Sequence, residues 1–412
     1  MTAIDVTPKG AAAPEHIPYE PPRQIRWTST GLLLAFLAVF PLLFPNPAVT
    51  SIAVITMIFL VAAIGWNIFS GYSGYISIGH AAYYGIGQYT VALLALHAKV
   101  PAGWDTFGLL PVAGLVSAVA AVPIGFVVLR VRRHTFIILT VAVMFILQLL
   151  AFNLVSWTNG SGGLEMSFPT WQGSYFNEPF YYVGLVAAIV ACAASWWVRR
   201  SKYGLGLLSI RDDEDRARGL GINATRTKLI AYAISAFFVG VAGGLYAPFI
   251  GSVYPQFGFD PTFDLAIAVL VFVGGIGTLS GPVIGALLLI PLQQYFYLQF
   301  GNANLYLIAY GVLFILILRL LPAGIAPSVT QLWRRALIAR RRAAARSPAV
   351  PALAGQSPAG QSPAGQSPAG QSPAGQSPAG QSPAGQSPAG GLPGAPPATA
   401  AVPHAGGDEV AR

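Results

Sequence analysis

The chain has 412 residues, of which 54% are hydrophobic and only 9% are charged, whereas a soluble domain carries about 25% charged residues. This composition excludes an ordinary soluble protein, and the recurring apolar runs, each about 20 residues long, predict membrane-spanning α-helices. The runs are continuous, which excludes the short alternating strands of an outer-membrane barrel. The single cysteine, Cys192, excludes an intramolecular disulfide. We therefore expect an all-α polytopic membrane protein.

Residues 1–26 are polar and proline-rich, and we expect a disordered cytoplasmic tail ahead of a membrane domain over residues 27–321. The apolar run Gly31–Phe44 has no evident small-residue cleavage site after it, so it is interpreted as a retained span. The hydrophobic pattern predicts ten crossings, centred on Leu32–Phe44, Ile52–Phe69, Ser77–Leu96, Leu109–Leu129, Phe136–Val155, Tyr181–Val198, Leu229–Phe249, Phe263–Val273, Val283–Leu298 and Leu305–Leu318. The short segment Phe263–Val273 is interpreted either as a full crossing or as one arm of a broken helix.

Positively charged residues form four groups, which favours one orientation because Lys and Arg accumulate on the cytoplasmic side of a membrane. The groups are Arg23 and Arg26; Arg130, Arg132 and Arg133; eight residues from Arg199 to Lys228; and a run from Arg319 to Arg346. With ten crossings, all four groups fall on one side and both termini are cytoplasmic. This bias accounts for most of the net charge of +9, so no nucleic-acid partner is expected.

One hydrophilic island, Arg199–Lys228, interrupts the apolar chain. Ser209 and Asp212 fit a capping box, which predicts that a helix begins there. Acids fill its first turn and bases its last, as the helix dipole favours, and Gly219 or Gly221 can end it. The island residues of interest are Ser209, Arg211, Asp212, Asp213, Glu214, Asp215, Arg216, Arg218, Gly219 and Gly221, including the i,i+4 pairs Asp212–Arg216 and Glu214–Arg218. So short a helix is marginal in water, which leaves docking on a partner protein, a lipid-surface helix or an ordinary loop helix.

Two glycine-rich segments, Gly65–Gly87 and Gly274–Gly285, lie in different halves of the chain. Glycine within a span permits either close helix packing or a broken helix beside a transport path, and the pattern leaves both open. The candidate path residues are Gly71, Gly74, Ser77, Gly79, His80, Gly85, Gly274, Gly275 and Gly277.

Ionisable residues inside the predicted spans are few, and each is a functional candidate for that reason. His80 has no carboxylate partner visible in the sequence, so a hydrogen-bonded structural role is favoured. Asp260 followed by Pro261 is typical of an N-cap with proline at the first helical position. Asp264 then falls in the first turn of that helix, where the dipole favours an acid. Capping is therefore favoured over proton coupling for both acids.

The chemistry-bearing motifs that an enzyme would need are not in the sequence. It contains no G-x-x-x-x-G-K-[ST] phosphate loop, no metal-ligand spacing and no nucleophile–base arrangement. We therefore expect no catalytic residues, no metal site and no cofactor. If the chain transports a solute actively, the energy comes from an ion gradient or from an ATPase on a separate chain.

Three segments, Gly71–Leu94, Leu207–Ala247 and Val269–Leu289, resemble the membrane permeases of branched-chain amino-acid ABC importers, of the LivH/LivM type and closer to LivM. The resemblance covers roughly residues 50–320. It implies a type II importer-like permease in the inner membrane, with a second related permease, two cytoplasmic ABC ATPases that bind ATP, and an extracytoplasmic solute-binding protein. It also implies that Ser209–Gly221 is the cytoplasmic coupling helix that docks into the ATPase. Asp264 stands where the family pattern leads us to expect an uncharged residue.

The resemblance implies alternating access for branched-chain or other small neutral amino acids. Related permeases for urea or short amides, an ion-coupled secondary transporter and a channel or membrane scaffold are the alternatives. After the last crossing, residues 322–346 are Arg-rich, which suits either anionic lipid heads or an ordinary cytoplasmic flank. Residues 347–412 contain seven tandem QSPAG units, which predict a disordered tail, interpreted as a neutral spacer or a docking tether.

Overall fold

The computed structural model describes residues 23–169, 171, 176–300, 311–312, 315, 319 and 324–328, with only the backbone described at 23–30 and 299–300. The chain divides into two units, Met1–Ser347 and Pro348–Arg412, and every described residue belongs to the first. The predicted crossing Leu305–Leu318, the Arg-rich segment, the QSPAG tail and most of the N-terminal tail lie largely or wholly outside the described residues.

Apolar helices make up most of the described chain. Among the described residues, seven helices are long and apolar enough to cross a membrane: Pro47–Gly71, Trp104–Val128, Arg133–Asn153, Asn177–Arg200, Ala224–Ile250, Pro255–Gly274 and Gly281–Leu298. A shorter apolar helix covers Gly31–Leu43. The protein is therefore a mostly helical, multi-pass membrane protein, as the composition predicted, while the total of ten crossings stays a prediction.

The elements follow one another in a simple order along the chain. They are α1 (Arg23–Leu43), α2 (Pro47–Trp66), the π-helix η1 (Asn67–Gly71), α3 (Ala81–His97), α4 (Trp104–Phe107), α5 (Leu110–Val128), α6 (Arg133–Asn153), α7 (Val155–Thr158), η2 (Gly160–Gly162), β1 (Leu164–Glu165), α8 (Asn177–Arg200), α9 (Lys202–Asp212), α10 (Glu214–Gly219), α11 (Ala224–Ile250), β2 (Ser252–Val253), α12 (Pro255–Gly258), α13 (Pro261–Gly274) and α14 (Gly281–Phe300). β1 and β2 pair antiparallel, with Leu164 opposite Val253.

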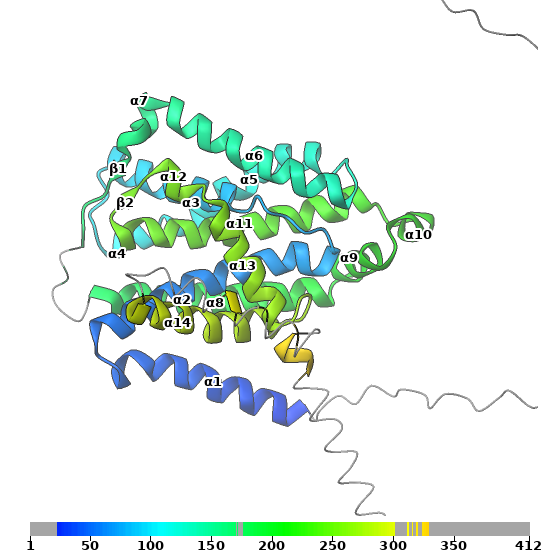
Figure 1. Cartoon of the computed structure of the whole chain (residues 1–412), viewed down its shortest axis with the longest axis horizontal. Helices are drawn as coiled ribbons and strands as arrows, with labels where there is room; N and C mark the ends of the chain where they lie inside the picture. The colour runs from blue at the N-terminus through cyan, green and yellow to red at the C-terminus, as the bar shows by residue number, and fades with distance from the viewer. Residues whose placement is uncertain are drawn as a thin grey trace, which may run out of the picture. The chain divides into compact units, whose positions relative to one another are not determined.

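Helix α11 forms the centre of the bundle, where it packs against α5, α3 and α2 (Figure 1). A Cβ on its Gly243 would lie 2.0 Å from the carbonyl oxygen of Tyr84, so only glycine allows α3 to approach this closely. Helix α6 lies at the periphery, and its Ile138 and Ile146 are 70% and 60% exposed. Such an exposed apolar face suits lipid or another apolar partner rather than water.

The chain is unwound between α2 and α3, over a stretch that we call the unwound segment, Gly74–His80. The third predicted crossing was centred on Ser77–Leu96, but the helix begins only at Ala81. Side chains replace the missing helical hydrogen bonds: the amide of Ser77 donates to Ser70 Oγ and that of Ile78 to Thr140 Oγ1, each over 3.3 Å. Unwound backbone is tolerated inside a bundle only with such partners.

Helix α13 corresponds to the short predicted segment Phe263–Val273. A break at Phe259 and Asp260 separates it from the single turn α12, which fits the broken-helix interpretation. Asp260 caps α13 as predicted, because its carboxylate accepts a hydrogen bond from the amide of Thr262 over 2.8 Å and Pro261 is the first helical residue.

The prediction that one helix begins at Ser209 is wrong. Ser209 lies near the end of α9, which starts after Ser201, whose side chain accepts from the amide of Gly204. A second helix, α10, starts after Asp213, whose carboxylate accepts from two amides. Asp213 has the extended backbone of an N-cap, whereas burial of Ile210 holds the chain around Ser209 in helical form. Packing has thus overridden the local capping pattern.

Candidate functional site

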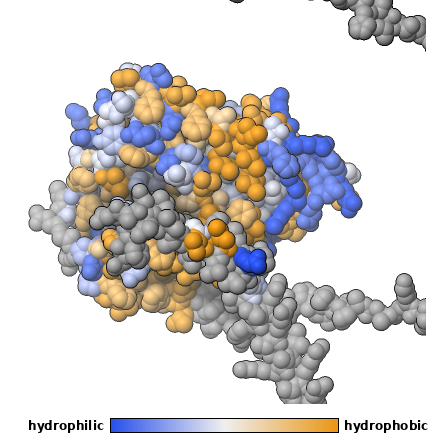
Figure 2. Space-filling model, in the orientation of Figure 1, coloured by the Kyte–Doolittle hydropathy of each residue, from blue (hydrophilic) through white to orange (hydrophobic). Residues whose placement is uncertain are grey.

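A broad hydrophilic patch covers the end of the bundle where α9 and α10 lie (Figures 1 and 2). Asp212, Asp215 and Arg216 are exposed there. Just beyond α10, Leu220 is 82% exposed, and a Cβ built on the adjacent Gly219 would meet nothing within 4 Å. This tip therefore combines charges of both signs with an unusually exposed leucine.

Glu214 at the start of α10 anchors this short helix to the bundle. It forms salt bridges to Lys228 over 2.9 Å and to Arg218 over 2.7 Å, and it accepts a hydrogen bond from the hydroxyl of Tyr75. The side chain of Lys228 is 1% exposed and that of Glu214 is 16% exposed. Arg216 pairs with Asp213 over 3.0 Å rather than with the predicted Asp212, whereas the predicted pair Glu214–Arg218 is confirmed.

The hydrogen bonds around Glu214 also set its ionisation. Burial by itself raises the pKa of Glu214, but the bonds from Tyr75, Lys228 and Arg218 outweigh it and leave the pKa below its usual value. Burial, together with the contact to Glu214, raises the pKa of Tyr75. Tyr75 therefore keeps its proton and Glu214 its charge at neutral pH, which is the arrangement that their hydrogen bond requires.

Two arginines connect α9 and α8 to the backbone of the glycine-rich segments, and a third, on α6, holds the end of α9. Arg211 donates to the carbonyl oxygen of Gly71 over 3.0 Å, and Arg199 donates to that of Gly277 over 2.8 Å. Arg133 donates to the carbonyl oxygens of Ile210 and Arg211 over 3.0 and 2.6 Å, which satisfies the otherwise unpaired C-terminal end of α9.

The two glycine-rich segments meet at this end of the bundle. The side chain of Asn67 donates to the carbonyl oxygen of Thr278 and accepts from the amide of Gly277, both over 2.9 Å. Gly277 has φ +73°, and a Cβ on it would lie 2.2 Å from the guanidinium of Arg211. Gly74 has φ +72° and packs on the same arginine. Both positions therefore require glycine for conformation and for space.

Deeper in the bundle, the unwound segment ends in a fully buried polar cluster. His80 contacts Ser77 Oγ through Nδ1 over 2.9 Å and Ser235 Oγ through Nε2 over 2.8 Å. Asp264 is 0% exposed, and its two carboxylate oxygens accept hydrogen bonds from the amides of His80 and Ala81, each over 3.0 Å. Both ring nitrogens of His80 thus have partners, as the favoured structural interpretation expects. Asp264 caps α3, not its own helix.

The remaining candidate path residues lie in close packing contacts. A Cβ on Gly79 would lie 2.2 Å from the carbonyl oxygen of Thr140, and one on Gly85 would lie 2.5 Å from the ring of Phe259. Gly274 packs on Gly281, and Gly275 packs on Pro327. These contacts explain the glycines by packing, and a solute path along them stays a prediction.

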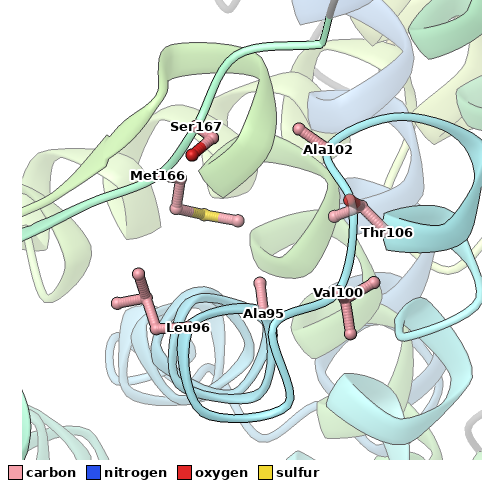
Figure 3. Close-up of a pocket in the computed structure, with 7 residues that line it drawn as sticks. All are labelled: Ala95, Leu96, Val100, Ala102, Thr106, Met166 and Ser167. Carbon is pink, nitrogen blue, oxygen red and sulfur yellow. The ribbon is translucent and has the colours of Figure 1, made fainter.

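A cavity of about 40 Å³ lies at the other end of the bundle, between the end of α3 and the chain that follows β1. Its lining includes Ala95, Thr106 and Met166 (Figure 3). This volume holds a few water molecules at most and is too small for an amino acid. Over the described residues, no group of three or more His, Cys, Asp or Glu side chains could hold a metal ion.

Sequence reasoning missed the residues that hold the island in place. Glu214 is contacted by Tyr75 and Lys228. The carbonyl oxygen of Arg211 accepts from Arg133, and Gly277 is contacted by Asn67 and Arg199. Lys228 had the clearest signal, because a lysine at the start of an apolar span needs a partner. The sequence offers no comparable signal for Tyr75 or Asn67.

Comparison with known proteins identifies the family. Residues 48–318 match the family described as "Branched-chain amino acid transport system / permease component". The chain is 32% identical over 323 residues to the high-affinity branched-chain amino acid transport system permease protein LivM of Salmonella typhimurium, which covers 72% of this chain and 73% of the relative. It is 30% identical to LivM of Escherichia coli K12, with the same coverage, and 28% identical to LivH of Salmonella typhimurium, over 64% of this chain and 89% of the relative. No solved structure gives a significant match. The chain therefore belongs to the family of permease components of branched-chain amino acid transport systems.

Proposed function

We propose that this chain is a membrane-spanning permease subunit of an ATP-driven importer in the inner membrane. It moves branched-chain or other small neutral amino acids by alternating access. Two ABC ATPases on separate chains supply the energy, a second related permease completes the membrane part, and an extracytoplasmic binding protein delivers the solute. In this proposal the N- and C-termini are cytoplasmic and ATP binds only to the partner subunits.

The contacts of α9 and α10 carry the proposal, together with the family match. Their outer surface is charged and presents Leu220, 82% exposed, as a docking contact. Their inner surface is fixed to the bundle by Glu214 and Arg211 through part-buried hydrogen bonds. A segment that is free on one side and rigidly joined to the bundle on the other can transmit a partner's movement. An ordinary surface loop has no need of the inner contacts.

The docking role is tested by shortening the exposed leucine at the tip. Burial of a leucine side chain in a partner's pocket is worth about 1.5–3 kcal/mol, so Leu220→Ala is expected to weaken ATPase binding by up to roughly 10–140-fold. Leu205→Ala is the matched control, because Leu205 is 61% exposed but lies near the start of α9. Binding is measured between the purified permease pair and the ATPase subunits. Equal affinities of the two variants would refute docking at the tip.

The class of transporter is tested by uptake into proteoliposomes that contain the complete assembly. We expect uptake that requires ATP and the ATPase subunits and that persists with an uncoupler. Uptake that collapses with an uncoupler and is indifferent to ATP identifies an ion-coupled transporter instead. Competition by leucine, isoleucine, valine and urea then separates an amino-acid permease from one for urea or short amides.

A further inference from the structure

Helix α13 is held firmly at both ends, by partners that belong to different parts of the bundle. At its C-terminal end, the following turn contains Gly277, whose amide donates to Asn67 and whose carbonyl oxygen accepts from Arg199. Arg211 of α9 fills the space beside the same glycine. Any displacement of the end of α9 therefore acts directly on the end of α13.

At the other end of α13, Asp264 reaches across to α3. Its carboxylate accepts the hydrogen bonds of the amides of His80 and Ala81, which are among the amides that a helix start leaves unpaired. An acid at this position also suits the positive end of the α3 dipole. The contact is completely buried, since Asp264 and His80 are each 0% exposed.

These two attachments lie far apart along one rigid element. Ten residues separate Asp264 from Gly274, which corresponds to about 15 Å of helix at 1.5 Å per residue. No break interrupts α13 between them, and its Ile267, Leu270 and Val271 are fully buried. A helix this well packed moves as a body instead of bending.

We propose that α13 is a strut that carries the movement of α9 to the unwound segment, and that Asp264 is the positioning residue that ties the strut to α3. The inference rests on the proposed function and adds the route by which coupling crosses the bundle. When α9 shifts, α13 shifts with it, and the start of α3 follows because Asp264 holds its amides. The unwound segment Gly74–His80 absorbs the change, since the amides of its Ser77 and Ile78 bond to side chains instead of forming helical hydrogen bonds.

The test compares two acids of the same helix, Asp264→Asn and Asp260→Asn, in the complete assembly in proteoliposomes. The readout is solute taken up per ATP hydrolysed. For Asp264→Asn we expect this ratio to fall at least tenfold while ATP hydrolysis stays within twofold, because the docking contacts lie at the other end of α13. Asp260 caps its own helix only, so its variant should leave the ratio unchanged.

Each other outcome is decisive. An unchanged ratio for Asp264→Asn overturns the inference, and so does a parallel fall of hydrolysis and uptake, which indicates general destabilisation. If the unaltered assembly shows no ATP-dependent uptake, the proposed function itself fails, whatever the variants do.

A second measurement does not depend on Asp264. The rings of Tyr84 and Phe263 stack with centroids 3.9 Å apart, so Tyr84→Cys with Phe263→Cys, in a Cys192→Ala background, is the pair chosen to join α3 to α13, and thiol titration checks that the disulfide has formed. Since the strut and α3 move together, the oxidised protein is expected to retain at least half of the uptake of the reduced protein. A protein that hydrolyses ATP but transports only when reduced would show that the two helices must separate, which overturns the inference.

Discussion

Glu214 offers the most direct test of what holds α10 on the bundle. Glu214→Gln keeps the size of the side chain but removes its charge, and it leaves the buried ammonium group of Lys228 without a counter-charge. Breaking a buried ion pair costs about 3–5 kcal/mol. The Glu214 side chain is 16% exposed, so water can approach it. We therefore expect Glu214→Gln to lower the free energy of local opening of α10 by about 2–3 kcal/mol.

Hydrogen–deuterium exchange of the α10 amides measures this loss, because their protection reports local opening. A cost of about 2–3 kcal/mol corresponds to a roughly 30–150-fold loss of protection. The matched control is Asp215→Asn, since Asp215 and Arg132 form a 4.0 Å pair whose side chains are 77% and 92% exposed, and such pairs contribute about 0–1 kcal/mol. Glu214→Gln with Lys228→Met should recover part of the protection, because no unpaired charge remains. If Glu214→Gln and Asp215→Asn have the same effect, the ion pair does not hold α10.

Two further outcomes follow from the same contacts. The pKa of Glu214 lies below its usual value, so the carboxylate's contribution is complete above the ordinary carboxyl pKa of about 4.3 and is lost as the pH falls through the lowered value. Protection of α10, corrected for intrinsic exchange rates, should therefore be constant from about pH 8 to 5 and fall only in stronger acid; a loss near pH 6 would contradict the assignment. Gly277→Ala places a Cβ 2.2 Å from the guanidinium of Arg211 at φ +73°, which should displace that arginine and lower uptake at least tenfold, whereas Gly219→Ala, with nothing within 4 Å, should not.

The sequence was most informative where a single local rule applies. Runs of apolar residues predicted the membrane class, and Asp260 with Pro261 predicted the start of α13, because capping depends on neighbours in the chain. The same kind of rule misplaced the helix start in the island, where Ser201 and Asp213, not Ser209, cap the helices. Ser209 fits the capping pattern, but buried Leu207 and Ile210 hold the chain around it in a helix. Such packing involves residues that the local pattern does not contain.

The long-range contacts of the site were beyond any local rule. Asp264 looked like a first-turn acid of its own helix, yet it caps α3, 183 residues away in the chain. The glycine segments carried two open interpretations, and each candidate path glycine lies against a specific neighbour, such as Gly85 against Phe259. Glycine marks places of close approach in a membrane bundle, but the sequence cannot say what approaches.

The ion pair beneath α10 is better explained by orientation than by stability. A buried ion pair commonly gives less net stability than apolar packing of the same volume, because both charges lose their hydration. Helix α10 has only six residues, too few for an apolar face to fix its direction. Glu214 can accept from Tyr75, Lys228 and Arg218 together only when α10 sits at one angle. A short helix must be held at a fixed angle if a displacement of Leu220 is to be transmitted to Arg211 and to the bundle. Without that constraint, the displacement would only rotate the helix.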